Sequence, residues 1–126
     1  MKTPRILIVD DDIDLLAALA RSLKDELACE IATSTGGDEA LSLMEQGSFD
    51  VLILDKQMPA MDGFEVLHQV RLRGIDLIVI MMTRLGDPAV IDLIEKKGAI
   101  YVPKPVTEKA LAALIRRELG AKGGAL

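Results

Sequence analysis

Four short apolar runs of this sequence each end in side chains suited to metal or phosphoryl chemistry. These side chains are Asp10, Asp11, Asp55, Thr83 and Lys104. Carboxylates that gather without a counter-charge repel one another, and a hard divalent cation such as Mg²⁺ relieves that repulsion. An aspartate nucleophile can form an aspartyl phosphate, and a hydroxyl and an ammonium group can hold the remaining phosphoryl oxygens. The set therefore predicts Mg²⁺-assisted transfer of a phosphoryl group onto a carboxylate.

The elements that must hold these side chains alternate between strands and helices. Expected strands cover residues 5–9, 30–33, 51–54, 77–82 and 100–102. After each of them lies a segment whose apolar residues recur at spacings of three and four, which is typical of an amphipathic helix. Five strands in strict alternation with five helices predict an α/β domain whose parallel sheet is covered on both faces. The carboxyl ends of such strands meet at one edge, where open α/β sheets bind their ligands.

Residues at the expected helix ends support this assignment. Asp12 is suited to the N-terminus of the first helix, where negative charge is favoured. Asp87 and Pro88 are typical of an N-cap and a first helical residue, and Gly98 is typical of the end of that helix. Thr107 is a candidate cap for the last helix.

The composition bounds the class of protein. The 126 residues, half of them hydrophobic, fit one domain with a single core, which we expect at residues 1–119. Residues 120–126 are expected to be a flexible tail or the start of a linker. The net charge of −5 argues against direct contact with nucleic acid. The single cysteine excludes an intrachain disulfide and no apolar run approaches transmembrane length, so we expect a soluble cytoplasmic protein without membrane contact.

Taken together, these motifs resemble the receiver domain of two-component response regulators, the CheY-like family. The resemblance covers residues 5–119, and its pieces are Ile8-Val9-Asp10-Asp11, Asp55, Met58-Pro59, Met61-Asp62-Gly63, Thr83, Gly98-Ala99, Tyr101 and Lys104-Pro105. Each piece is weak alone, whereas the ordered set at these intervals is specific. The resemblance implies a flavodoxin-like doubly wound sheet of five parallel strands in the order 2-1-3-4-5, with five helices.

The resemblance also implies a role for each residue of the acidic site. Asp55 would be the phosphoacceptor, and Lys104 would pair first with Asp55 and then with the incoming phosphoryl group. The expected Mg²⁺ ligands are Asp10, Asp11, Asp55 and the main-chain carbonyl of Gln57.

A switch is implied for the residues beside this site. The Thr83 hydroxyl would donate to a phosphoryl oxygen, and Tyr101 would change rotamer as Thr83 moves. The peptide bond before Pro105 would be cis. The surface formed by the fourth helix, fifth strand and fifth helix would thereby change.

The same resemblance implies partners. A sensor histidine kinase or a phosphotransfer protein would donate the phosphoryl group. A downstream effector domain or target protein would read the switch, and a homodimer through the switch surface is open. The domain would catalyse its own phosphorylation and dephosphorylation, without turnover of a metabolite.

Four departures from the family pattern concern the same region. Arg84 stands where the family usually has a small residue, and we expect its long cation to lean toward the pocket and alter access for water or a phosphatase. Lys56 is unusual beside the nucleophile and is a second candidate modulator. The stretch before Tyr101 is one residue shorter than usual, which affects the geometry of its coupling to Thr83. Val106 replaces the common aromatic residue and is expected to change packing alone.

Alternative functions remain open at this stage. A pseudo-receiver would act as an interaction module that never takes phosphate, although the acids, Thr83 and Lys104 argue against it. A small Mg²⁺-dependent phosphatase with an aspartate nucleophile would want a second acid two residues after Asp55, where this chain has Gln57. Flavin binding on the same fold would want a phosphate loop rich in Ser, Thr or Gly, which the acids after the first strand would repel.

Overall fold

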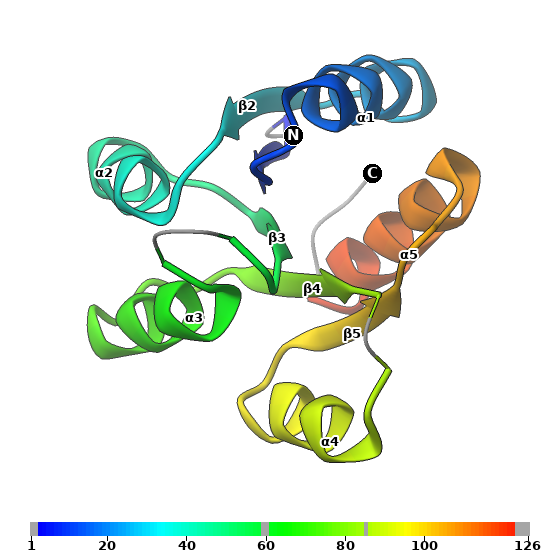
Figure 1. Cartoon of the computed structure of the whole chain (residues 1–126). Helices are drawn as coiled ribbons and strands as arrows, with labels where there is room; N and C mark the ends of the chain where they lie inside the picture. The colour runs from blue at the N-terminus through cyan, green and yellow to red at the C-terminus, as the bar shows by residue number, and fades with distance from the viewer. Residues whose placement is uncertain (1–2, 59–60, 85, 123–126) are drawn as a thin grey trace.

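Five parallel strands and five helices make up the chain in a computed structural model that describes residues 3–58, 61–84 and 86–122 (Figure 1). The strands are β1 (Arg5–Val9), β2 (Glu30–Ser34), β3 (Val51–Asp55), β4 (Ile78–Thr83) and β5 (Ile100–Pro103). The helices are α1 (Ile13–Glu26), α2 (Gly37–Gln46), α3 (Gly63–Leu72), α4 (Pro88–Lys96) and α5 (Glu108–Ala121). The strand order β2-β1-β3-β4-β5 confirms the predicted α/β fold.

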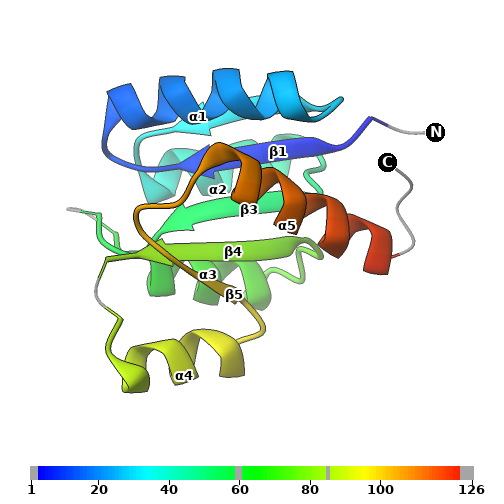
Figure 2. The same cartoon turned by 90° about the vertical axis from the view of Figure 1, so that its right-hand side faces the viewer.

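The helices form two layers around the sheet. Helices α1 and α5 cover one face, while α2, α3 and α4 cover the other (Figures 1 and 2). Side chains alternate along the buried strands, so that Ile8 and Ile53 pack toward α1 and α5. Val9 and Leu54 pack toward the opposite helices. Strands β1, β3 and β4 are buried on both sides, which explains why they are continuous apolar runs rather than alternating ones.

The strand register brings the ends of four strands level with one another. Val9 is paired with Leu54, so Asp10 and Asp55 each follow one of two adjacent paired residues. Asp55 is paired with Met82, and the next residue of β4, Thr83, is paired with Pro103. The predicted site residues therefore lie along one sheet edge.

Local sequence signals mark the helix ends that the sequence analysis predicts. The carboxylate of Asp12 accepts from the Leu15 amide at 3.1 Å and thereby caps α1. The side chains of Asp87 and Thr107 cap α4 and α5 in the same way. Gly98 ends α4 with φ of 78°, a left-handed conformation that favours glycine.

Several boundaries differ from the sequence expectation by one or two residues. Helix α5 continues through Ala121, so Gly120 and Ala121 are helical rather than part of a tail, while residues 123–126 lie outside the described residues. Asp55 and Thr83 are the last residues of their strands rather than the first residues of loops, because each still lies in register with its neighbouring strand. In the described ranges, no helix has the length and apolar character needed to span a bilayer.

The start of α3 packs closely against the end of β3. A Cβ atom added at Gly63 would lie 2.8 Å from the Asp55 carbonyl oxygen and 2.8 Å from the Lys56 Cα, both main-chain atoms. The Gly63 amide also donates to the Lys56 carbonyl at 2.8 Å. Only glycine fits this approach, so Gly63 fixes the main chain that carries Asp55.

We expect Gly63→Ala to destabilise the protein by about 1–3 kcal/mol, because the methyl group would force apart two main-chain segments. Gly120→Ala is the matched control, since no atom lies within 4 Å of a Cβ built there on α5. That substitution should leave stability unchanged or raise it by about 0.5–1 kcal/mol. Urea unfolding of both variants measures the difference, and equal stabilities would contradict this account of Gly63.

Candidate functional site

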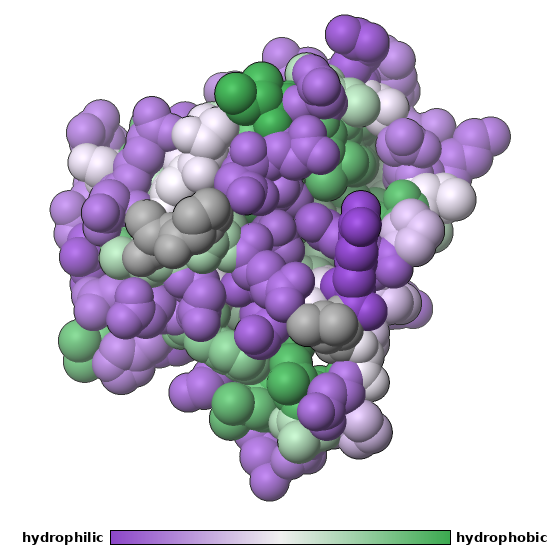
Figure 3. Space-filling view, viewed as in Figure 1, coloured by the Kyte–Doolittle hydropathy of each residue, from purple (hydrophilic) through white to green (hydrophobic). Residues whose placement is uncertain are grey.

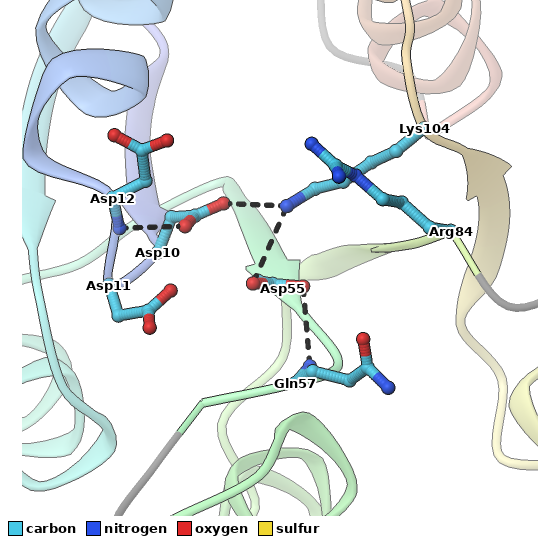
Figure 4. A pocket seen from close by; sticks show the side chains of 7 residues that line it. All are labelled: Asp10, Asp11, Asp12, Asp55, Gln57, Arg84 and Lys104. Atoms are coloured by element: carbon cyan, nitrogen blue, oxygen red, sulfur yellow. Dashed lines mark hydrogen bonds and ion pairs between the residues drawn. The ribbon is translucent and has the colours of Figure 1, made fainter.

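An open pocket of about 220 Å³ lies at the carboxyl edge of the sheet (Figure 4). Seven residues line it, namely Asp10, Asp11, Asp12, Asp55, Gln57, Arg84 and Lys104. They come from the ends of β1, β3, β4 and β5 and from the loops that follow. In the space-filling view, hydrophilic side chains gather over the middle of this side of the molecule (Figure 3). The structure thus brings together most of the residues that the sequence singles out.

Lys104 joins two buried carboxylates. Its ammonium group lies 2.9 Å from Asp10 Oδ2 and 3.4 Å from Asp55 Oδ2 (Figure 4). Asp10 and Asp55 are 1% and 6% exposed, so neither charge is well hydrated by water. Burying unpaired carboxylates would be costly, and the shared cation offsets that cost. The peptide bond between Lys104 and Pro105 is cis, as predicted.

Three carboxylates converge as a metal site requires. One oxygen from each of Asp10, Asp11 and Asp55 lies within 4.8 Å of the other two. Asp10 and Asp55 are buried and Asp11 is exposed, so the cluster opens to solvent on one side. A set of carboxylate oxygens with one open side suits Mg²⁺, which takes oxygen ligands and retains several waters.

Asp10 and Asp55 also accept hydrogen bonds from the main chain that follows each of them. The Asp12 amide donates to Asp10 Oδ1 at 2.9 Å, and the Gln57 amide donates to Asp55 Oδ1 at 3.2 Å. Sequence reasoning assigned Asp12 to the cap of α1 alone, whereas the structure shows that it also lines the pocket. The signal was present in the run of three consecutive aspartates, but only the turn after β1 decides which of them face the pocket.

The pKa of the Asp55 carboxyl is raised above its ordinary value of 3.8, mainly because burial disfavours the charged form. The Gln57 amide lowers the pKa, the Asp10 carboxylate raises it, and Lys104 lowers it again. The carboxylate of Asp55 is therefore less stable in this pocket than in water. A cation that binds beside Asp55 therefore relieves an unfavourable charge.

Thr83 and Tyr101 lie beside the pocket rather than on its wall. Thr83 is fully buried at the end of β4, and its main-chain carbonyl accepts from the Lys104 amide at 3.1 Å. Tyr101 is half-buried and packs in the core layer of α2, α3 and α4. A Cβ added at Gly86 would lie 3.2 Å from the Tyr101 hydroxyl, so this hydroxyl lies against the segment between β4 and α4.

The two candidate modulators point in different directions. Arg84 is exposed and lines the pocket. The ammonium group of Lys56 lies 5.4 Å from the centre of the Phe64 ring on α3, and Lys56 is not among the residues that line the pocket. Of these two cations, only Arg84 is placed to meet a group bound at Asp55.

Residues 6–116 match the sequence profile of the family described as "response regulator receiver domain". The chain belongs to this family. Receiver domains are signalling domains, and their acidic pockets typically bind Mg²⁺. The three converging carboxylates of this chain fit that property of the family.

Curated relatives share this receiver domain. The chain is 39% identical over 116 residues to the probable transcriptional regulator ycf27 of Guillardia theta, covering 91% of this chain and 45% of that protein. It is 33% identical over 116 residues to the transcriptional regulatory protein AfsQ1 of Streptomyces coelicolor, covering 92% and 51%. The chain therefore spans about half the length of these two relatives.

Solved receiver structures agree with the fold. The chemotaxis protein CheY4 of Vibrio cholerae superposes with a TM-score of 0.85 at 29% identity, covering 92% of this chain and 98% of that one. The signal receiver domain of the putative LuxO repressor protein from Vibrio parahaemolyticus superposes with a TM-score of 0.90 at 27% identity, covering 95% and 92%.

The raised pKa of Asp55 predicts how the metal-free receiver responds to pH. A carboxyl whose pKa is raised by folding contributes stability below its ordinary value, and this contribution is lost as pH rises through the raised value. We therefore expect Asp55→Asn to be more stable than the unsubstituted protein at pH 7 with a chelator present. The gain should shrink as pH falls toward 3.8. Urea unfolding across this range measures it, and a variant less stable at pH 7 would disprove the expectation.

Proposed function

We propose that this receiver domain accepts a phosphoryl group on Asp55, in the presence of Mg²⁺, from a sensor histidine kinase or a phosphotransfer protein. The observation that carries the proposal is the convergence of three carboxylates, with oxygens within 4.8 Å, onto a pocket that also holds the Lys104 ammonium. Carboxylate, divalent cation and lysine are the groups that phosphoryl transfer to an aspartate needs.

The metal would be held by the carboxylates of Asp10, Asp11 and Asp55 and by the main-chain carbonyl of Gln57. When bound, Mg²⁺ supplies positive charge that neutralises the phosphoryl oxygens as they approach the acids. Lys104 orients Asp55 from the side of β5, and its ammonium group is close enough to shift from the carboxylates to a phosphoryl oxygen.

In the transfer step, an Asp55 carboxylate oxygen attacks the phosphorus of the donor. A bond forms between this oxygen and phosphorus while the bond from phosphorus to the donor's histidine nitrogen breaks, and its electron pair stays on the imidazole. Hydrolysis removes the phosphoryl group. A water oxygen bonds to phosphorus, the bond from phosphorus to the Asp55 oxygen breaks with its electron pair staying on the carboxylate, and a proton of the water passes to solvent. Desolvation of Asp55 raises its pKa, so the carboxylate oxygen that attacks phosphorus is more basic than it would be in water.

Thr83 and Tyr101 would respond to the phosphoryl group. Thr83 ends β4 next to Asp55, and its hydroxyl would donate to a phosphoryl oxygen. The adjoining segment carries Gly86 against the Tyr101 hydroxyl, so a shift of that segment would move the tyrosine. The surface of α4, β5 and α5 would then change, with a bias of a few kcal/mol sufficient for a two-state response.

The biological context follows from the relatives. Because the chain spans about half of their length, an effector domain or a separate target protein would supply the output. A homodimer through the surface of α4, β5 and α5 is part of the proposal, as is a cytoplasmic location. The net charge of −5 argues against direct nucleic acid contact by this domain.

Incubation with acetyl phosphate and Mg²⁺ should add one phosphoryl group, detected by intact mass spectrometry. Asp55→Ala removes the nucleophile and should abolish the mass gain. Asp25→Ala is the control, because Asp25 is an exposed acid on α1 that does not line the pocket. If the unsubstituted protein gains no mass, the chain is instead a phosphorylation-independent interaction module.

Mg²⁺ should raise the thermal midpoint of the unsubstituted protein, because a ligand that binds only the folded state stabilises it. Asp11→Asn should weaken Mg²⁺ binding by about tenfold or more, since a neutral amide replaces a charged ligand. Asp14→Asn removes one exposed acid from the first turn of α1 without altering the pocket. Titration calorimetry compares the three proteins, and equal affinities would exclude Asp11 as a ligand.

A further inference from the structure

Arg84 lies on the side of the sheet edge that holds the nucleophile. Along β4, Met82 packs toward α1 and α5, whereas Met81 packs toward the other helices. Continuing this alternation assigns Thr83 to the side of α4 and Arg84 to the side of Asp55. The pocket lining agrees, since it includes Arg84 together with Asp55 and Lys104 (Figure 4).

The Arg84 cation has no acidic partner in the described ranges, 3–58, 61–84 and 86–122. The ion pairs of the pocket there are the two formed by Lys104, which engages Asp10 and Asp55. The pocket is lined by four aspartates and two cations, and one of those cations is already committed to two carboxylates. Arg84 is therefore the cation available to a new anion that enters above Asp55.

We propose that Arg84 is an additional phosphoryl-binding residue, whose guanidinium binds the oxygens of the incoming donor and then of the aspartyl phosphate on Asp55. This inference rests on the proposed function of Asp55. A guanidinium presents several donors in a planar fork that matches phosphoryl oxygens, and charge-assisted bonds of this kind are stronger than neutral ones. The aspartyl phosphate would carry between one and two negative charges in a pocket already rich in acids, so a second cation reduces the repulsion.

The same placement affects hydrolysis. Water must attack phosphorus on the side opposite the bond to the Asp55 oxygen. Arg84 is exposed and reaches over the pocket from the end of β4 (Figure 4). A guanidinium bound to the outer phosphoryl oxygens occupies part of that approach, so it both attracts the donor and slows the loss of phosphate.

The test uses Arg84→Ala with acetyl phosphate and with phosphoramidate, each with saturating Mg²⁺. We expect the bimolecular rate constant of phosphorylation to fall about three- to tenfold for both donors, as for loss of one charge-assisted contact. The lifetime of the aspartyl phosphate should shorten by at least about twofold. Raising the ionic strength should reduce the difference in phosphorylation rate, because an exposed cation is screened.

Two further variants separate a specific contact from a general charge effect. Arg84→Lys keeps the charge without the planar fork and should recover part of the rate and lifetime. Lys109→Ala removes one exposed cation near the start of α5, outside the pocket, and should behave as the unsubstituted protein. Circular dichroism confirms that each variant is folded.

The outcomes distinguish this inference from the proposed function. If Arg84→Ala is phosphorylated at the rate of the unsubstituted protein, or if its aspartyl phosphate has an unchanged lifetime, the role of Arg84 is overturned. Asp55 would remain the phosphoacceptor in either case. If Arg84→Ala and Lys109→Ala reduce the phosphorylation rate equally, the effect comes from net charge, and the role of Arg84 is overturned as well. No phosphorylation of the unsubstituted protein would contradict the proposed function itself.

Discussion

The ammonium group of Lys104, held between the buried carboxylates of Asp10 and Asp55, is the interaction on which the site depends. Parallel strands place their polar end residues at one edge, and the register sets Asp10 and Asp55 side by side. Two buried carboxylates that lie side by side would repel one another, and water would hydrate neither of them well. The Lys104 cation, which reaches both acids from the end of β5, offsets the cost of burying them as charged groups.

Lys104 does not compensate the two buried negative charges completely. Burial still raises the pKa of Asp55 in spite of Lys104 and the Gln57 amide. Asp11 adds a further negative group from the exposed side. The folded pocket thus retains an excess of negative charge, which the proposed Mg²⁺ ion would offset. The stability of the fold, which comes from the two apolar layers, tolerates this local cost.

Side-chain alternation divides the edge of the sheet into two compartments. Asp10, Asp55 and Lys104 occupy the compartment on the side of α1 and α5, and Arg84 extends into it. Tyr101 packs with the core layer of α2, α3 and α4. The alternation of side chains along β4 assigns Thr83 to the same side. The carboxylate cluster and the Tyr101 side chain therefore lie on opposite faces of one sheet.

The sequence alone was sufficient to predict the strands, the caps and the chemical types at the strand ends. Apolar runs, N-capping acids and a helix-ending glycine are local signals, and the order of motifs identified the receiver family. Tertiary structure alone decided which charged side chains meet. Arg84 and Lys56 each stand next to an expected site residue in the sequence, yet one lines the pocket and the other lies over the Phe64 ring. The pleat of the strand and the neighbouring helix determine the directions of the Arg84 and Lys56 side chains. The few residues around each cation do not determine either of these features.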